Sequence, residues 1–97
     1  MKIHFFEQDV VDACCVFASK RLNCTPEDVD VDLQFNPSSG FAADARRDQQ
    51  NIRLTEQEII DGVAVYLADY HQFVPERLKV NLIFNQQTGI EADILTD

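Results

Sequence analysis

The chain has 97 residues, of which 17 are acidic and 8 basic, giving a formal net charge of −9 at neutral pH. This charge argues against binding to nucleic acid or to an anionic membrane surface, because both depend on Lys and Arg side chains that neutralise phosphates. Apolar residues make up 45% of the chain, enough for a folded core. The longest apolar run, residues 13–18, is too short to cross a bilayer. No charged and then apolar leader follows Met1, so we expect a cytoplasmic protein.

The sequence contains an internal repeat. Residues 2–48 align without a gap on residues 51–97, at a spacing of 49 positions, and 15 of the 47 aligned pairs are identical. Because a unit of this size has a marginal core by itself, we expect the two copies to share one core and to form a single domain over residues 1–97. The repeat is also an internal control, since a residue kept in both copies most simply serves the shared fold.

Each copy is predicted to begin with a helix. Apolar residues recur at helical spacing from about residue 7 to 22 and from about residue 56 to 72, with Tyr66 and Tyr70 among them. In the second copy, Thr55 and Glu58 form a capping box that favours a helix start. The short segments before the helices, residues 3–5 and 52–54, also alternate in polarity, and the pattern leaves open whether they are strands.

A hairpin is predicted after each helix. A Pro-Glu pair ends the helix, and apolar and polar residues then alternate over residues 29–36 and, except at Ile83, over residues 78–85, as in half-buried strands. A short loop with asparagine at its start and glycine at its end leads into a returning strand over residues 41–46 and 90–95.

These elements predict an α+β fold. We expect a tandem αββ repeat with pseudo-twofold symmetry, whose mainly antiparallel sheet of at least four strands has two helices packed on one face. If the segments before the helices are strands, the order approaches a variant of the ferredoxin-like split βαβ arrangement, which is the alternative fold.

No constellation of catalytic residues is evident. All three cysteines align with apolar residues of the other copy, which indicates small buried side chains, and Cys24, near a loop, is the best candidate for a reactive thiol. Neither histidine is kept, because His4 aligns with Arg53 and His71 with Leu22. We find no nucleophile–base pair, glycine-rich phosphate loop or metal-ligand spacing, and therefore expect no cofactor.

Acidic residues of the first hairpin suggest one candidate metal site. In the register expected for the first hairpin, Asp32 lies opposite Asp44, and Asp30 faces Arg46. The open sheet face would then carry an acidic patch of Asp30, Asp32 and Asp44, and such oxygen-rich sites suit hard divalent cations. The patch could bind a cation or a basic partner, or it could be an ordinary solvated face.

Several apolar residues fall on helix and sheet faces that are expected to be exposed to solvent. Val16 and Val65 are identical in the two copies and lie on the polar side of each predicted helix, whereas Ile83 and Leu95 fall on the outer face of the predicted sheet. These four residues are our candidates for an interface between two copies of the chain, because scattered exposed apolar residues need no explanation but a patch does.

Two short motifs carry a family resemblance. The pattern Glu-Gln-Asp/Glu-aliphatic-aliphatic-Asp opens both helices at residues 7–12 and 56–61, and Phe-Asn precedes both hairpin loops at residues 35–36 and 84–85. Together they resemble the YxcD-like family of small uncharacterised proteins from Gram-positive bacilli, over nearly the whole chain. The resemblance implies a cytoplasmic setting and carries over no activity and no site.

Two classes of function are compatible with these features. The first, which we favour, is a non-enzymatic, self-associating interaction or regulatory module, whose partner is a second copy in a homodimer or another protein. It predicts an exposed apolar patch and no deep pocket. The alternative is a small ligand- or divalent-cation-binding protein that uses the acidic sheet face, or a small enzyme. It predicts a cleft with several carboxylates of perturbed pKa.

Overall fold

The computed structural model describes residues 1–96. The predicted helices and hairpins are confirmed, and a strand precedes each helix, so each copy has the order strand, helix, strand, strand. Short 3-10 turns at Pro26–Asp28 and Pro75–Arg77 link each helix to its hairpin. The strands and helices in chain order are β1 (Lys2–Phe5), α1 (Glu7–Leu22), β2 (Asp30–Asn36), β3 (Gly40–Arg47), β4 (Gln50–Thr55), α2 (Glu56–His71), β5 (Leu78–Asn85) and β6 (Gly89–Thr96).

Local side-chain hydrogen bonds explain where the elements begin and turn. The Thr55 hydroxyl accepts from the Glu58 amide at 3.2 Å, and the Glu58 carboxylate accepts from the Thr55 amide at 2.9 Å, so the predicted capping box is confirmed. In each hairpin loop the asparagine side chain accepts from the amide two residues on, at 2.8 Å for both Asn36 and Asn85. These bonds stabilise helix starts and tight turns.

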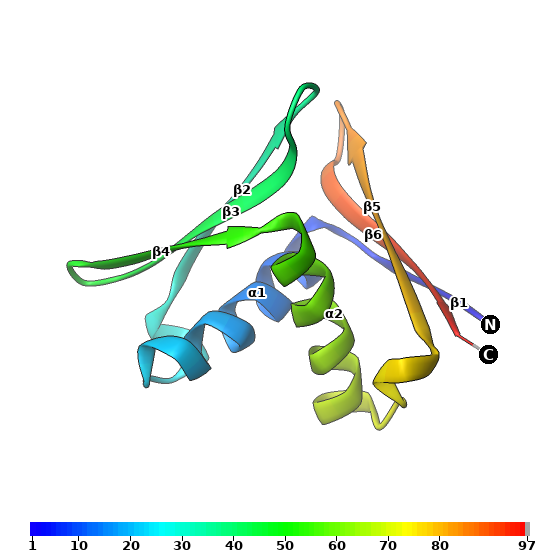
Figure 1. Ribbon diagram of the computed structural model, residues 1–97, viewed down its shortest axis with the longest axis horizontal. Coiled ribbons are helices and arrows are strands. Elements are labelled where there is room, and N and C mark those ends of the chain that lie inside the picture. Colours follow the sequence, from blue (N-terminus) through cyan, green and yellow to red (C-terminus); the bar gives the residue numbers. More distant parts are fainter. Residues whose placement is uncertain (97) are drawn as a thin grey trace.

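The six strands form two three-stranded antiparallel sheets, in the orders β2-β3-β4 and β1-β6-β5. Each sheet is a hairpin of one copy completed by the first strand of the other copy, because β4 pairs with β3 and β1 pairs with β6. The α+β class, the tandem repeat and the antiparallel pairing are confirmed. The strands do not join into one sheet, since β3 and β6 already have a neighbour on both sides and β2 and β5 diverge from the hairpin tips (Figure 1).

The two sheets converge at their hairpin tips and form an angle, and both helices lie inside this angle (Figure 1). Where the hairpin tips meet, the aligned residues Phe35 and Phe84 stack with ring centroids 4.6 Å apart. This stack joins the two tips through side chains instead of backbone pairing. The buried core draws on both copies, and its largest fully buried side chains include Leu54, Ile59 and Ile94. Over residues 1–96, no helix is long and apolar enough to cross a membrane.

A carboxylate from each helix start fastens the hairpin of the other copy. The Glu7 side chain accepts from the backbone amide of Ile90 at 3.2 Å, and the Glu56 side chain accepts from the amide of Phe41 at 3.0 Å. Glu7 and Glu56 are aligned, as are Phe41 and Ile90, so the two contacts are related by the pseudo-twofold axis. The retention of this glutamate in both copies is thus explained by contact between the copies, beyond its favourable place at a helix N-terminus.

Candidate functional site

The three aspartates of the candidate metal site lie on the outer face of the β2-β3-β4 sheet in the predicted register. Asp32 is opposite Asp44, as expected. The Asp44 carboxylate, however, is already engaged: Arg53 donates to it at 3.0 Å from the neighbouring strand, and Gln34 donates at 2.7 Å. Within residues 1–96, no three His, Cys, Asp or Glu side chains are grouped so that they could hold a metal ion. A cation at Asp30, Asp32 and Asp44 would have to compete with Arg53 and stays a prediction.

The other sheet has the equivalent ion pair with a histidine in place of the arginine. His4 Nδ1 lies 2.7 Å from a carboxylate oxygen of Asp93, and His4 Nε2 lies 3.2 Å from one of Glu91, which is only 7% exposed. Lys2 also pairs with Asp93, at 3.4 Å. Two carboxylates favour the imidazolium, in which both ring nitrogens are donors. The pKa of His4 is raised, above all by its hydrogen bond to Asp93.

This arrangement predicts a pH-dependent contribution to stability. Because the folded pKa of His4 lies above its ordinary value of 6.5, the contribution is fully present below pH 6.5 and is lost as the pH rises through the folded value. The pKa of Asp93 is lowered by its hydrogen bond to His4, so Asp93 loses its contribution only in acid, as the pH falls through a folded pKa below 3.8. We therefore expect His4→Gln to destabilise the protein more at about pH 5.5 than at about pH 8.5.

Urea unfolding of wild type and variant at the two pH values measures this difference. Arg53→Gln is the matched control, because Arg53 makes the equivalent ion pair but stays charged at both pH values. Its effect is expected to be the same at the two values. A loss for His4→Gln that does not change with pH would contradict the assignment.

Cys14 and Cys15 are not poised for nucleophilic chemistry, and a reactive Cys24 stays a prediction. Cys14 is fully buried, and burial raises the pKa of its thiol to about 12. Burial also raises the pKa of the Cys15 thiol, with further contributions from the negative charges of Asp12 and Asp30. Cys15 donates to the backbone carbonyl of Val29 at 3.5 Å. Both thiols are therefore protonated at neutral pH, whereas a reactive thiol needs a lowered pKa.

The four candidate interface residues do not lie together. Val16 is only 8% exposed, so the expectation that it lies on a wet helix face is wrong: α2 covers that side of α1. Val65 and Ile83 are half-buried, and Leu95 is 44% exposed. The strand register places the polar Asn81–Asp93 pair between Ile83 and Leu95, so the outer sheet face has no continuous apolar patch there.

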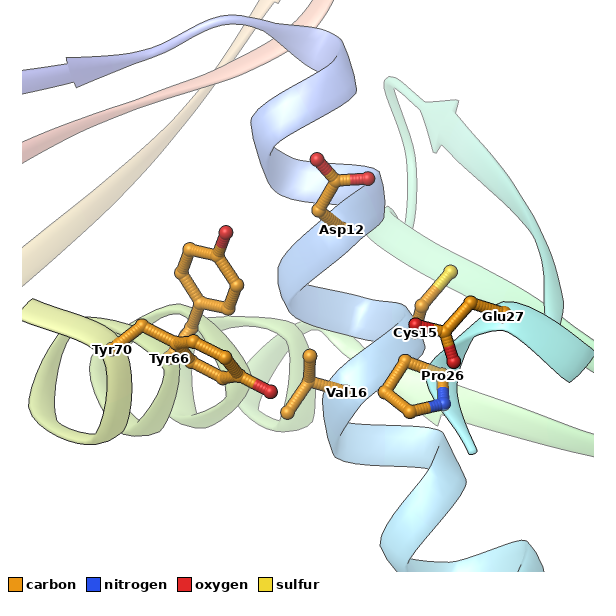
Figure 2. Close-up of a pocket in the computed structure, with 7 residues that line it drawn as sticks. All are labelled: Asp12, Cys15, Val16, Pro26, Glu27, Tyr66 and Tyr70. Carbon is orange, nitrogen blue, oxygen red and sulfur yellow. The ribbon is translucent and has the colours of Figure 1, made fainter. Parts of the chain in front are cut away.

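An open groove between the two helices is lined in part by Val16. It has a volume of about 280 Å³ and draws on both copies of the repeat (Figure 2). Its lining residues are Asp12, Cys15 and Val16 from α1, Pro26 and Glu27 from the following turn, and Tyr66 and Tyr70 from α2. The sequence places Tyr66 and Tyr70 in the apolar pattern expected to face the core, but the Tyr70 side chain is 56% exposed.

The groove combines aromatic rings with negative charge. Tyr66 and Tyr70 are stacked, with ring centroids 4.9 Å apart. The pKa of Tyr66 is raised by burial and then by the negative charges of Asp12 and Asp9, which places both carboxylates in electrostatic range of its hydroxyl. None of the lining residues is Lys or Arg. This chemistry suits a cationic group, because aromatic faces and carboxylates both attract one.

Comparisons with known proteins agree with the repeat. A family model described as "Protein of unknown function (DUF2653)" matches the chain twice, over residues 1–52 and over residues 49–97. The uncharacterized protein YxcD of Bacillus subtilis (strain 168) is 41% identical over 46 residues, which are 46% of this chain and 45% of that protein. The aligned segment thus spans about half the length of this curated relative. No solved structure matches the chain.

Each match covers one copy of the repeat. The two matches together span the whole chain, and the resemblance to YxcD-like proteins is confirmed. Neither match names an activity, a ligand or a partner. The chain belongs to the DUF2653 family.

Proposed function

We propose that this protein is a non-enzymatic interaction module that binds a basic partner protein in the groove between α1 and α2. The composition of the groove supports this proposal. Its lining combines two carboxylates, Asp12 and Glu27, with two tyrosines, and the Cys15 thiol and Tyr66 hydroxyl both have raised pKa values. The groove therefore attracts a cation and offers no thiolate or phenolate nucleophile at neutral pH.

The charge of the whole chain favours a basic protein over a second copy of this one. With a net charge of −9, two copies repel each other, whereas a basic partner is attracted over a long range. Self-association is the second arrangement that we propose to test, because Leu95 is 44% exposed on the outer sheet face. We place either activity in the cytoplasm, where the free cysteines of this chain would stay reduced.

Affinity capture from the native cell, followed by mass spectrometry, tests the proposal. We expect a stoichiometric basic protein to be held by the wild-type chain, and to be lost by about tenfold or more with Tyr70→Ala. Leu95→Ala is the matched control, because it removes an exposed apolar side chain from the far sheet face.

Capture of the same protein by wild type and by Tyr70→Ala would contradict a role for the groove. Light scattering on the purified chain decides between the two arrangements. A dimeric mass that becomes monomeric with Leu95→Ala would favour self-association across the sheet, and a monomeric mass at high concentration would exclude it.

A further inference from the structure

The pseudo-twofold axis supplies a comparison for the groove. Each lining residue has an aligned partner 49 positions away, and these partners come together on the other side of the helix pair. Asp12 and Glu27 are matched by Asp61 and Glu76, so both sides keep their carboxylates. The aromatic side differs, because Tyr66 is matched by Phe17 while Tyr70 is matched by a basic residue, Arg21.

On that other side the chain provides its own cation. The Arg21 guanidinium lies over the Phe17 ring, 4.7 Å from the ring centroid, and forms an ion pair with Glu58. A guanidinium stacked on a ring and held by a carboxylate is a stable arrangement, because the planar group uses its face and its edge at once. Aromatic ring, carboxylate and guanidinium therefore form one complete set.

On the side of the groove, the ring and the carboxylate are kept, and a tyrosine ring takes the place of the guanidinium. The ring is that of Tyr66, and the carboxylate aligned with Glu58 is Asp9. Burial and then the negative charges of Asp12 and Asp9 raise the pKa of Tyr66, and one Asp9 oxygen accepts from the Phe6 amide at 2.9 Å, as the aligned Glu58 does from the Thr55 amide. Tyr70 stands where the other side has Arg21, and its ring stacks on Tyr66.

Building on the proposed function, we propose that the groove binds the guanidinium of an arginine side chain of the partner protein, stacked against Tyr66 and Tyr70 and paired with Asp9 and Asp12. The volume of about 280 Å³ lies just below the usual range for small-molecule sites and accommodates one long side chain. The negative charge of the lining residues excludes an acidic side chain, and planarity separates arginine from lysine.

Titration with capped tripeptides tests this directly. Acetyl-Gly-Arg-Gly-amide is compared with its lysine and citrulline analogues by NMR at about pH 8, where the arginine and lysine peptides are both charged. We expect the arginine peptide to shift the signals of Val16, Tyr66 and Tyr70, and to bind at least about tenfold more tightly than the citrulline peptide, which has the same shape without the charge.

Two reciprocal substitutions use the pseudo-symmetry. Tyr70→Arg gives the groove a cation of its own and is expected to abolish binding of the arginine peptide there. Arg21→Tyr removes the internal cation on the other side and is expected to create a second site, with new shifts at Phe17 and Glu58. Circular dichroism of both variants shows whether they are folded, and the comparison of peptides on the wild-type chain needs no variant.

Equal binding of the arginine and citrulline peptides, binding of the lysine peptide as tightly as arginine, shifts outside the groove, or no binding would each overturn the inference. These outcomes differ from a failure of the proposed function. A captured partner that depends on Tyr70 while the arginine peptide does not bind would leave the groove as a binding surface and remove arginine as its ligand. If capture of the partner does not depend on Tyr70 and the arginine peptide does not bind, the groove is not a binding surface.

Discussion

Neither half of this chain is expected to fold by itself, whereas an equimolar mixture of residues 1–48 and residues 49–97 is expected to regain the fold. The reason is the exchange of first strands. In the intact chain, β1 completes the β5-β6 hairpin and β4 completes the β2-β3 hairpin. An isolated half keeps only a two-stranded hairpin and one helix, which is marginal in water. It also loses the core side chains of the other half, such as the fully buried Leu54.

The expected effect is the whole stability of the fold, about 5–15 kcal/mol for a protein of this kind. Circular dichroism of each half and of the mixture measures it, with light scattering to give the mass of the complex. The cut falls between two exposed turn residues, Asp48 and Gln49, so it removes no buried contact. A half that is helical and monomeric alone would contradict the shared core.

The mixed complex is expected to be preferred over homodimers of either half. Lys20 and Asp69 are aligned in the repeat and form an ion pair of 2.8 Å where the two helices meet. A homodimer of the first half would bring two Lys20 side chains together, and a homodimer of the second would bring two Asp69 side chains together. Because both side chains are about half exposed, the preference is modest, about 0.2–1 kcal/mol. Lys20→Asp is expected to weaken the mixed complex, and Asp69→Lys to restore it.

Local patterns predicted the elements well. The helix starts at Glu7 and Glu56 and the register that places Asp32 opposite Asp44 are confirmed, because capping, alternation and turn chemistry are properties of short segments. In β2 and β5, successive residues alternate in exposure as expected over residues 30–33 and 78–81, but not toward the hairpin tips, where Phe84 is 44% exposed.

The exchange of strands between copies was not predicted. A short alternating segment can pair with either hairpin, and the two hairpins have nearly the same pattern. One signal was available: only Asp48 and Gln49 separate β3 from β4, and a two-residue connection holds consecutive strands in one sheet. By symmetry, β1 then completes the other sheet.

The candidate sites were harder to predict, because aligned residues of different types can make the same contact. His4 and Arg53 differ as residue types, yet both pair with the aligned aspartates Asp93 and Asp44. The sequence predicts Val16 on a solvent-exposed face, because a helix at a protein surface usually buries a single stripe of apolar side chains. In this fold α1 contacts both sheets and α2, so more than one face is covered, and its edge becomes the groove.

The alignment of Tyr70 with Arg21 was the available signal for the groove. A position that holds tyrosine in one copy and arginine in the other is unsuited to a core, since arginine is almost never fully buried without a partner. Both are amphipathic side chains with a flat polar or aromatic group, which suits a partly exposed position beside a ring.

Substituting alanine at Gly89 is expected to lower the free energy of unfolding by about 1–3 kcal/mol. Gly89 has φ +93°, which disfavours any residue with a Cβ, and an added Cβ would overlap the Glu7 carboxylate. The overlap would displace the Glu7 carboxylate from the backbone amide of Ile90, which donates a hydrogen bond to it at 3.2 Å. Gly40→Ala is the matched variant, because Gly40 has φ +88° and its added Cβ would lie 2.5 Å from a Glu56 oxygen.

A double-mutant cycle separates the two causes. Glu7→Ala alone is expected to cost about 0.5–1.5 kcal/mol, through loss of its hydrogen bond to the second hairpin. In the Gly89→Ala background it is expected to cost less, because removing the carboxylate also removes the overlap and leaves only the backbone strain. Losses that add to within about 0.5 kcal/mol would show that Glu7 and Gly89 do not interact. A clear departure from additivity, repeated with Glu56 and Gly40, would show that each helix start stabilises the hairpin of the other copy.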